Sequence, residues 1–155
     1  MKKNVVWLVL SSLMVAALVL ASCAPAVTEE EEATLPAGTA VEHDERGTVL
    51  ALAGLYKQAI TEFNKAVELD PEYAMVYNNR GNAYWNKGNF DRAIADYDKA
   101  IKLDPEYAEA YSNRGFVYYL KGELTKAISD LEKCLELSDD FRVVAKAQQL
   151  LDQLR

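Results

Sequence analysis

The sequence has few of the residues from which metal sites, disulfide frameworks and catalytic centres are built. Its 155 residues include one histidine and two cysteines, too few for a four-ligand zinc site or a disulfide-rich scaffold. His43 and Cys134 have no partner base or nucleophile in the sequence pattern, so we expect a packing or surface role for His43 and a small buried residue at Cys134. Asp91, Asp96 and Asp98 stand among Lys and Arg, as solvated surface charges do. We therefore expect no metal, no cofactor and no enzymatic activity.

Basic residues are also scarce. The chain has 17 Lys and Arg against 24 Asp and Glu, a formal net charge of -7 and a pI near 4.8. Such a charge repels a phosphate backbone unless a local basic patch overrides it, and the sequence contains no such patch. We therefore expect no nucleic-acid partner.

The one long apolar run lies at the N-terminus. Lys2 and Lys3 precede an apolar stretch over residues 5–21 that is broken only by Ser11 and Ser12, which is the pattern of a secretory signal. An uncleaved membrane helix is the alternative. However, 17 residues rise only about 25 Å as a helix, less than the roughly 30 Å of a hydrocarbon core. The pattern therefore favours an exported protein.

The apolar run ends in Leu20-Ala21-Ser22-Cys23. This segment resembles the lipobox of bacterial lipoproteins, which implies a signal peptide over residues 1–22, cleavage before Cys23, and a covalent lipid on Cys23. Lipid chains would then anchor the protein to a membrane. Ala24 replaces the Asp that marks inner-membrane retention, so an outer-membrane or cell-surface location stays open.

An acidic segment follows the cysteine. Residues 24–38 carry Pro, Thr, Ala and Gly around four consecutive glutamates at positions 29–32, without a sustained apolar period. This composition predicts a solvated, flexible tether over residues 23–39 with a root-mean-square reach of roughly 20 Å. A metal or partner site on the glutamates is the alternative, and we assign it no ligand.

A motif recurs with a period of 34 residues. Asp70-Pro71-Glu72-Tyr73-Ala74 reappears as Asp104-Pro105-Glu106-Tyr107-Ala108. The same displacement relates Arg-Gly pairs, single glycines and Ala-Ile pairs elsewhere in the chain. The period defines three copies, followed by a closing segment: 40–73, 74–107, 108–141 and 142–155.

Each copy has the apolar pattern of two helices separated by a break at its second glycine. Thr39 and Glu42 have the spacing of a capping box, which would begin the first helix at Ala40. Asp104 is expected to cap a later helix, with Pro105 in its first turn. These patterns predict an all-α solenoid of three helix-turn-helix repeats. A C-terminal capping helix would cover the last apolar face.

The middle copy resembles the tetratricopeptide repeat (TPR) at its main signature positions, which are Tyr77, Gly81, Tyr84, Ala93, Tyr97, Ala100 and Pro105. The first copy departs from the pattern, with His43 in place of Tyr77 and Leu50 in place of Tyr84. The resemblance implies that the first helices of the repeats line a concave groove. In this family such a groove receives an extended peptide or a helix of a partner.

When the groove positions of the family are carried over to this sequence, ten residues are expected to line the groove. Asn79 and Asn113 occupy equivalent positions in two repeats. They resemble the row of asparagines by which some family members bind a peptide backbone. Three aromatic residues are candidate apolar anchors. The alternative is that the asparagines are merely solvated and the aromatic rings form inter-repeat core. The ten residues are Asn78, Asn79, Asn82, Trp85, Asn86, Glu109, Ser112, Asn113, Phe116 and Tyr119.

The family's basic clamp for a C-terminal carboxylate is poorly matched. Asp44, Thr48, Glu109 and Asn113 stand where this clamp would need mostly Lys, Asn and Arg. Asn79 is the one residue that matches the clamp. The acidic inner rim formed by Asp44, Glu45 and Glu109 predicts a neutral or basic partner. The expected function is that of a membrane-anchored, non-catalytic adaptor or scaffold in the cell envelope. The alternatives are a structural or assembly factor of an envelope machine, such as a pilus or secretion channel, and self-association through the solenoid ends.

Overall fold

The computed structural model describes residues 38–154, and within that range the chain forms seven helices and no strands. The predicted signal peptide, Cys23 and most of the tether lie outside the described residues. No helix of the described range is long and apolar enough to span a membrane. The helices are α3 (Ala40–Leu52), α4 (Tyr56–Leu69), α5 (Ala74–Asn86), α6 (Phe90–Leu103), α7 (Ala108–Leu120), α8 (Leu124–Leu137) and α9 (Phe141–Leu154).

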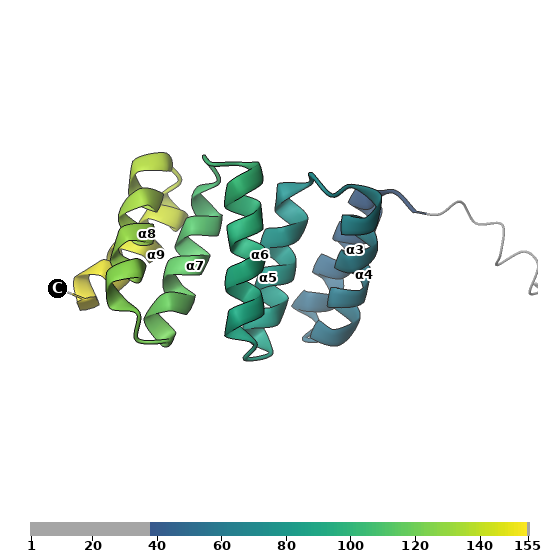
Figure 1. Ribbon diagram of the computed structural model, residues 1–155, viewed down its shortest axis with the longest axis horizontal. Helices are drawn as coiled ribbons and strands as arrows, with labels where there is room; N and C mark the ends of the chain where they lie inside the picture. The colour runs from purple at the N-terminus through teal and green to yellow at the C-terminus, as the bar shows by residue number, and fades with distance from the viewer. Residues whose placement is uncertain (1–37, 155) are drawn as a thin grey trace, which may run out of the picture. The chain divides into compact units, whose positions relative to one another are not determined.

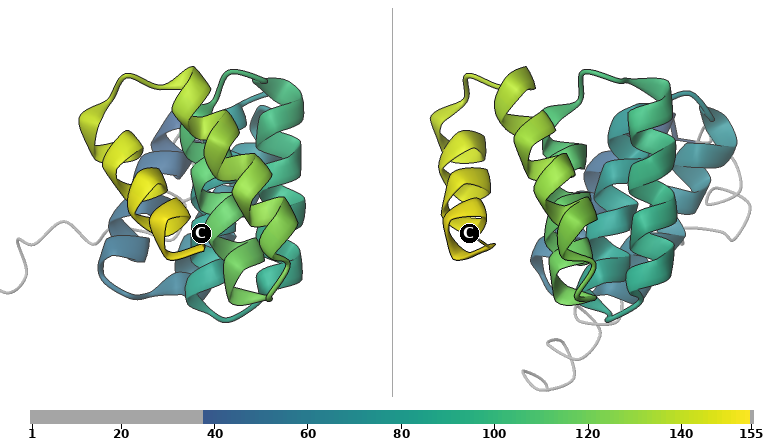
Figure 2. Two further views of the ribbon diagram at one scale, coloured as in Figure 1. Left: turned by 90° about the vertical axis from the view of Figure 1, so that its left-hand side faces the viewer. Right: turned by 60° about the vertical axis from the view of Figure 1, so that its left-hand side comes forward.

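The helices stack side by side in two rows. Successive helices run antiparallel, and the pairs α3–α4, α5–α6 and α7–α8 follow one another along the molecule (Figure 1). Helices α3, α5, α7 and α9 form one row, and α4, α6 and α8 form the other (Figure 2). Within the first row, α3 contacts α5, α5 contacts α7, and α7 contacts α9. The predicted all-α solenoid is therefore confirmed.

The first helix begins as the sequence predicts. Thr39 Oγ1 accepts a hydrogen bond from the Glu42 backbone N–H at 3.2 Å, and Glu42 Oε2 accepts one from the Thr39 N–H at 3.1 Å. This reciprocal pair satisfies two amide donors that a helix start otherwise leaves free. The capping box is confirmed.

The prediction that Asp104 caps a helix was wrong. Helix α7 begins only at Ala108, after a tyrosine whose side chain makes no capping bond. Asp104 Oδ1 instead accepts from the Glu106 N–H at 3.0 Å, and Asp70 Oδ1 makes the same bond to Glu72. These carboxylates stabilise the tight turn between repeats, because Asp side chains readily bond the backbone two residues ahead. Pro105 lies in that turn.

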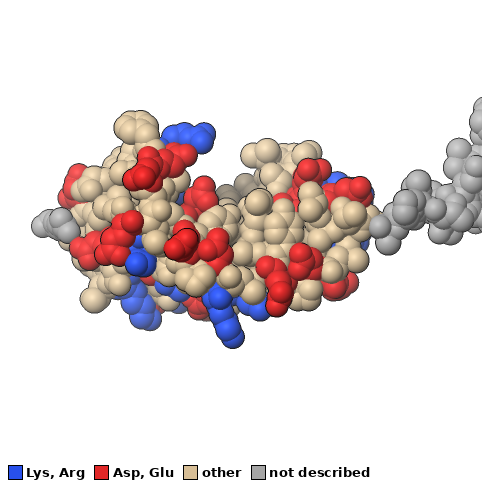
Figure 3. Space-filling view, turned by 90° about the horizontal axis from the view of Figure 1, so that it is seen from above, with Lys and Arg blue, Asp and Glu red and all other residues tan. Residues whose placement is uncertain are grey.

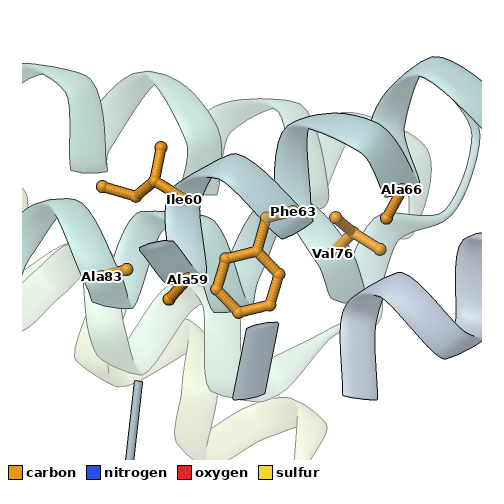
Figure 4. Close-up of a cluster of buried hydrophobic side chains, with 6 residues drawn as sticks. All are labelled: Ala59, Ile60, Phe63, Ala66, Val76 and Ala83. Carbon is orange, nitrogen blue, oxygen red and sulfur yellow. The ribbon is translucent and has the colours of Figure 1, made fainter. Parts of the chain in front are cut away.

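The core of the first repeats forms around Phe63 of α4, which is completely buried. Figure 4 shows its ring beside Ala59 and Val76. A Cβ atom added at Gly47 would lie 2.5 Å from the Phe63 ring, and one at Gly81 would lie 2.7 Å from the equivalent ring of Tyr97. Glycine at these positions therefore lets each first helix approach its partner closely enough to contact a buried ring.

The last helix covers the end of the solenoid. Ala147, Leu150 and Leu151 of α9 are buried and pack against Leu131 and Cys134 of α8. Asp140 precedes α9 and caps its start, since its Oδ1 accepts from the Arg142 N–H at 2.8 Å. The apolar side of α9 thus shields what the third repeat would otherwise expose.

Candidate binding groove

Two neighbouring hollows lie along the row of first helices. The larger, of about 480 Å³, is bounded by α5, α7 and α9, and the other, of about 370 Å³, by α3, α4 and α5. Asn79 and Asn82 line both hollows and therefore lie at the boundary between them; the two hollows together are called the groove below. Six of the ten residues that the sequence places in a groove line the larger hollow: Asn78, Asn79, Asn82, Glu109, Ser112 and Asn113.

Asparagine amides link the first helices to one another along this groove. Asn79 Nδ2 donates to Asp44 Oδ1 of α3 at 2.9 Å, and Asn113 Nδ2 donates to Asn78 Oδ1 of α5 at 3.0 Å. At the far end, Lys146 Nζ of α9 donates to Asn113 Oδ1 at 3.1 Å. An amide has two donor hydrogens and an acceptor oxygen. Asn79 and Asn113 therefore hold neighbouring helices together and keep hydrogen-bonding capacity for a ligand.

The two remaining asparagines differ in burial. Asn82 Oδ1 accepts from the buried Tyr97 hydroxyl at 2.8 Å, which orients its amide toward the core. Asn86 is exposed at the end of α5, lines only the smaller hollow, and donates to the Asn82 carbonyl at 2.8 Å. Asn86 therefore belongs to the smaller hollow and not to the larger one.

The three aromatic residues pack between repeats. Trp85 meets Phe116 edge to face, with 5.5 Å between ring centroids, and Phe116 lies 6.4 Å from Tyr119. Trp85 contacts the core around Tyr97, and Tyr119 contacts that around Leu131. Phe116 lines a small hollow of about 170 Å³ between α7 and α9, which shares Ser112 and Lys146 with the larger hollow. This placement fits the inter-repeat alternative for Trp85 and Tyr119.

Charges of both signs face the groove. Burial raises the pKa of the Asp44 carboxyl, and burial with the nearby Glu109 raises the pKa of Tyr107 to about 12. Asp140, Arg142 and Lys146 line its α9 end. Burial lowers the pKa of Lys146. Figure 3, viewed from the end that carries the turns between repeats, shows acidic side chains along the length of that face.

Sequence reasoning missed the contribution of α9 to the groove because it treated that helix as a cap. The signal was present in the period, since Lys146 lies 34 residues after Ser112 and 68 after Asn78. Extending the register by one more copy would have placed Lys146 on the groove. The closing helix therefore acts both as a cap and as the fourth member of the lining.

Arginine–aspartate pairs fix the groove helices to the second row. Arg80 bonds Asp96 of α6 through two contacts of 2.9 and 2.7 Å, and a further 2.8 Å bond reaches Asn64 of α4. Asp96 is only 7% exposed, so the prediction that it is a solvated surface charge was wrong. Arg114 repeats the arrangement with Asp130, at 2.8 and 2.7 Å. Each arginine thus joins three helices.

His43 and Cys134 are packing residues in the structure. His43 is 7% exposed, and its Nδ1 lies 2.7 Å from Glu62 Oε2. Cys134 is completely buried, and burial raises the pKa of its thiol, which disfavours the reactive thiolate. Within residues 38–154, no cluster of three or more His, Cys, Asp or Glu side chains has an arrangement that could hold a metal ion.

Stacked helix pairs, a polar groove and buried arginine pairs repeated at a fixed period define a helical-repeat solenoid. Sequence profiles of the TPR repeat match residues 47–88 and 86–122, and a profile of the tetratricopeptide repeat matches residues 108–141. The chain belongs to the tetratricopeptide-repeat family. Domains of this fold serve protein–protein interaction and peptide binding.

Solved structures are similar to this chain over most of the described range. The first TPR domain of Spaghetti (RPAP3), bound to the HSP90 peptide SRMEEVD, has a TM-score of 0.67 and 29% identity, covering 74% of this chain and 92% of that one. The second TPR domain of the same protein, with the same peptide, gives 0.64 and 30%, covering 69% and 99%. The TPR domain of P58(IPK) gives 0.70 and 27%, covering 74% and 32%. No curated protein matches the sequence.

Proposed function

We propose that this chain is a membrane-anchored, non-catalytic adaptor of the cell envelope whose groove holds an extended segment of another protein. The observation that carries the proposal is the line of amides along the groove. Asn79 and Asn113 lie at equivalent places on α5 and α7 and line the same hollow. Amides spaced in this way can bond the donor and acceptor groups of a peptide backbone without dictating its side chains.

The groove also constrains the charge of the partner. The similar Spaghetti domains were solved with an acidic peptide, SRMEEVD. In this chain Asp44, Thr48 and Glu109 stand where a clamp for a terminal carboxylate would need mostly cations. The positive groups Arg142 and Lys146 lie only at the α9 end. We infer that a neutral or basic segment lies along α3, α5 and α7.

Loss of the groove amides is the first test of this proposal. In-cell crosslinking and pull-down of the lipidated protein should recover a partner, and the Asn79→Ala, Asn113→Ala variant should recover at least tenfold less of it. Glu109→Lys should likewise weaken the capture of a basic partner and reduce its dependence on salt, because opposite charges attract across the interface. The amount of partner per captured chain, measured by mass spectrometry, is the readout.

A matched control separates ligand binding from stability in this experiment. Asn89→Ala removes an exposed amide that lines neither hollow of the groove and should leave capture unchanged. Because Asn79 also bonds Asp44 and Asn113 also bonds Asn78, thermal unfolding of each variant is measured in parallel. Equal recovery of the same partner by the double variant and the parent, with both folded, would exclude the groove as its binding site.

Membrane anchoring rests on Cys23 and its preceding residues, and it has a separate test. Replacement of Cys23 by serine removes the thiol to which lipid would attach. The variant should lose incorporation of a radiolabelled or alkyne-bearing palmitate and retain its signal peptide, as seen by mass spectrometry. The parent should lose Lys2 and Lys3 on cleavage, which changes its formal charge from -7 to -9. A Cys134→Ser control should still be labelled. Labelling of the Cys23→Ser variant would sink the lipoprotein proposal.

A further inference from the structure

We propose that the outer side of α3 is a second binding surface, distinct from the groove, and that it receives an amphipathic helix of a partner protein. We call this surface the end face and define it by Glu42, Arg46, Val49 and Leu50. Together with Glu45 and Glu62, these residues line a hollow of about 620 Å³. The proposal does not depend on the groove and goes beyond it.

The period of the chain shows what normally covers this side of a first helix. Val49 corresponds to Ala83 of α5 and Val117 of α7, which lie 34 and 68 residues later. Ala83 and Val117 are each only 1% exposed, because the second helix of the preceding repeat packs over them, whereas Val49 is 66% exposed. Among residues 38–154, the same apolar position is therefore covered in the second and third repeats and open in the first.

Arg46 lacks the hydrogen-bond acceptor that a preceding helix supplies to the equivalent arginines. Arg80 donates to Asn64 Oδ1 on the preceding helix α4, and Arg114 donates to Asp98 Oδ1 on the preceding helix α6. The side chains of Arg80 and Arg114 are 16% and 18% exposed, whereas that of Arg46 is 56% exposed. The nearest carboxylate oxygens to Arg46 are 3.7 and 3.9 Å away, beyond hydrogen-bonding distance.

The two ends of the solenoid are finished differently. At the C-terminal end, α9 covers α8 and presents polar side chains such as Gln148 and Asp152 to solvent. A terminal repeat needs such a polar outer face to stay soluble by itself. Within the described range nothing equivalent covers α3, whose exposed apolar residues are Val41, Val49 and Leu52. Phe141 at the start of α9 is also exposed, but the outer side of α3 is where the described solenoid leaves a helix-packing side uncovered.

The chain's own covering helices specify the partner. Helix α4 presents Ile60, Asn64 and Val67 to α5, and α6 presents Ile94, Asp98 and Ile101 to α7. Both follow one pattern, in which an aliphatic residue is followed four positions later by an amide or carboxylate and three positions after that by another aliphatic residue. A partner helix with this pattern would fill the end face, and its Asn or Asp would accept from Arg46.

The probe for this surface is a synthetic peptide with the α6 sequence, residues 90–103. It is crosslinked on its solvent side to hold the helix, because a free helix of this length is marginal in water, and it carries a benzophenone beside Ile94. Binding to the full chain in detergent is measured by fluorescence anisotropy, and the crosslinked site by mass spectrometry. We expect crosslinks within α3 and at least a tenfold weaker affinity for both Arg46→Glu and Val49→Asp chains.

Charge reversal gives the decisive arm. An Asp98→Arg peptide should bind the Arg46→Glu chain within threefold of the parent pair. A Lys133→Glu chain, reversed at an exposed site far from α3, should behave as the parent. Both α3 substitutions lie at exposed positions, and circular dichroism of each variant is used to check that it folds. Three results would overturn the proposal: no binding, crosslinks outside α3, or a dimer of the chain that dissociates on Val49→Asp and so occupies the face with a second copy.

Discussion

Replacement of Arg114 by alanine is expected to lower the free energy of unfolding by about 3–5 kcal/mol, because it leaves a buried carboxylate without its partner. Asp130 is 6% exposed and receives two hydrogen bonds from Arg114, and a third bond from Arg114 reaches Asp98. Removing the guanidinium strands the Asp130 charge in the interior and uncouples α7 from both α6 and α8. Urea unfolding followed by circular dichroism measures the change.

Two further variants show whether the loss comes from the stranded charge. Arg46→Ala removes the equivalent arginine from a solvent-exposed site and should cost less than about 1 kcal/mol. Adding Asp130→Leu to an Arg114→Met chain should restore most of the stability, because an apolar pair of similar volume replaces a buried ion pair at little cost. If Arg114→Ala lowered the free energy of unfolding as little as Arg46→Ala does, the Arg114–Asp130 pair would contribute no more than an exposed ion pair. That result would contradict the prediction.

The period made much of the fold predictable, because every repeat solves the same packing problem. Gly88 marks the break between two helices, and its φ of +74° shows why a residue without a side chain is needed there. Gly81 marks the close approach of α5 to α6. Both residues are required by local backbone geometry or by steric fit, and such requirements can be recognised in a single sequence.

Interactions between repeats were harder to predict, because they depend on how the repeats stack. Asn79 bonds Asp44, and Asn113 bonds Asn78, each across 35 residues, one more than the period. A search for equivalent residues aligns Asn79 with Asn113 but says nothing of the neighbours that they bond. The extra residue reflects how far one first helix is shifted along the next, and this shift is known only from the folded structure.

The burial of Asp96 could have been predicted from its spacing to buried alanines, but the basic residues near it in the sequence favoured the wrong interpretation. Asp96 lies three residues after Ala93 and four before Ala100, and both alanines are fully buried. Residues at these spacings share one side of a helix, so the position was predictable as buried. The nearby basic residues suggested a solvated face, but the guanidinium that pairs with Asp96 comes from Arg80 on another helix.

The same side chains that stabilise the solenoid also shape its groove. Asn79, Asn113 and Lys146 are already held by hydrogen bonds that cross between first helices. A ligand that uses their remaining hydrogen-bonding capacity need not order them first, which reduces the entropic cost of binding. The Arg80 and Arg114 pairs fix the spacing of α5 and α7 from behind. The groove is therefore preorganised both by bonds among its own lining residues and by the arginine pairs that lie outside it.

Replacement of Phe63 by alanine is expected to cost about 3–5 kcal/mol and to unfold α3 and α4 in preference to the rest. The Phe63 ring is fully buried and packs against Gly47, so its loss opens a cavity between these two helices. Each repeat of a solenoid contacts only its neighbours, and damage to one repeat is therefore felt mainly there. Hydrogen exchange should accelerate in α3 and α4 while the amides of α7, α8 and α9 stay protected.

A tyrosine at position 63 is the matched control. Tyr97 occupies the equivalent place in the next repeat, where its hydroxyl bonds Asn82, and Thr48 stands where Asn82 would be in the first repeat. Phe63→Tyr therefore keeps the ring and gives its hydroxyl a partner of the right kind, so its stability should stay within about 1 kcal/mol of the parent. Uniform loss of protection from α3 to α9 in the Phe63→Ala chain would mean that the repeats unfold as one cooperative unit. In that case the open end face would be stabilised from the far end of the molecule, and stability could not be assigned repeat by repeat.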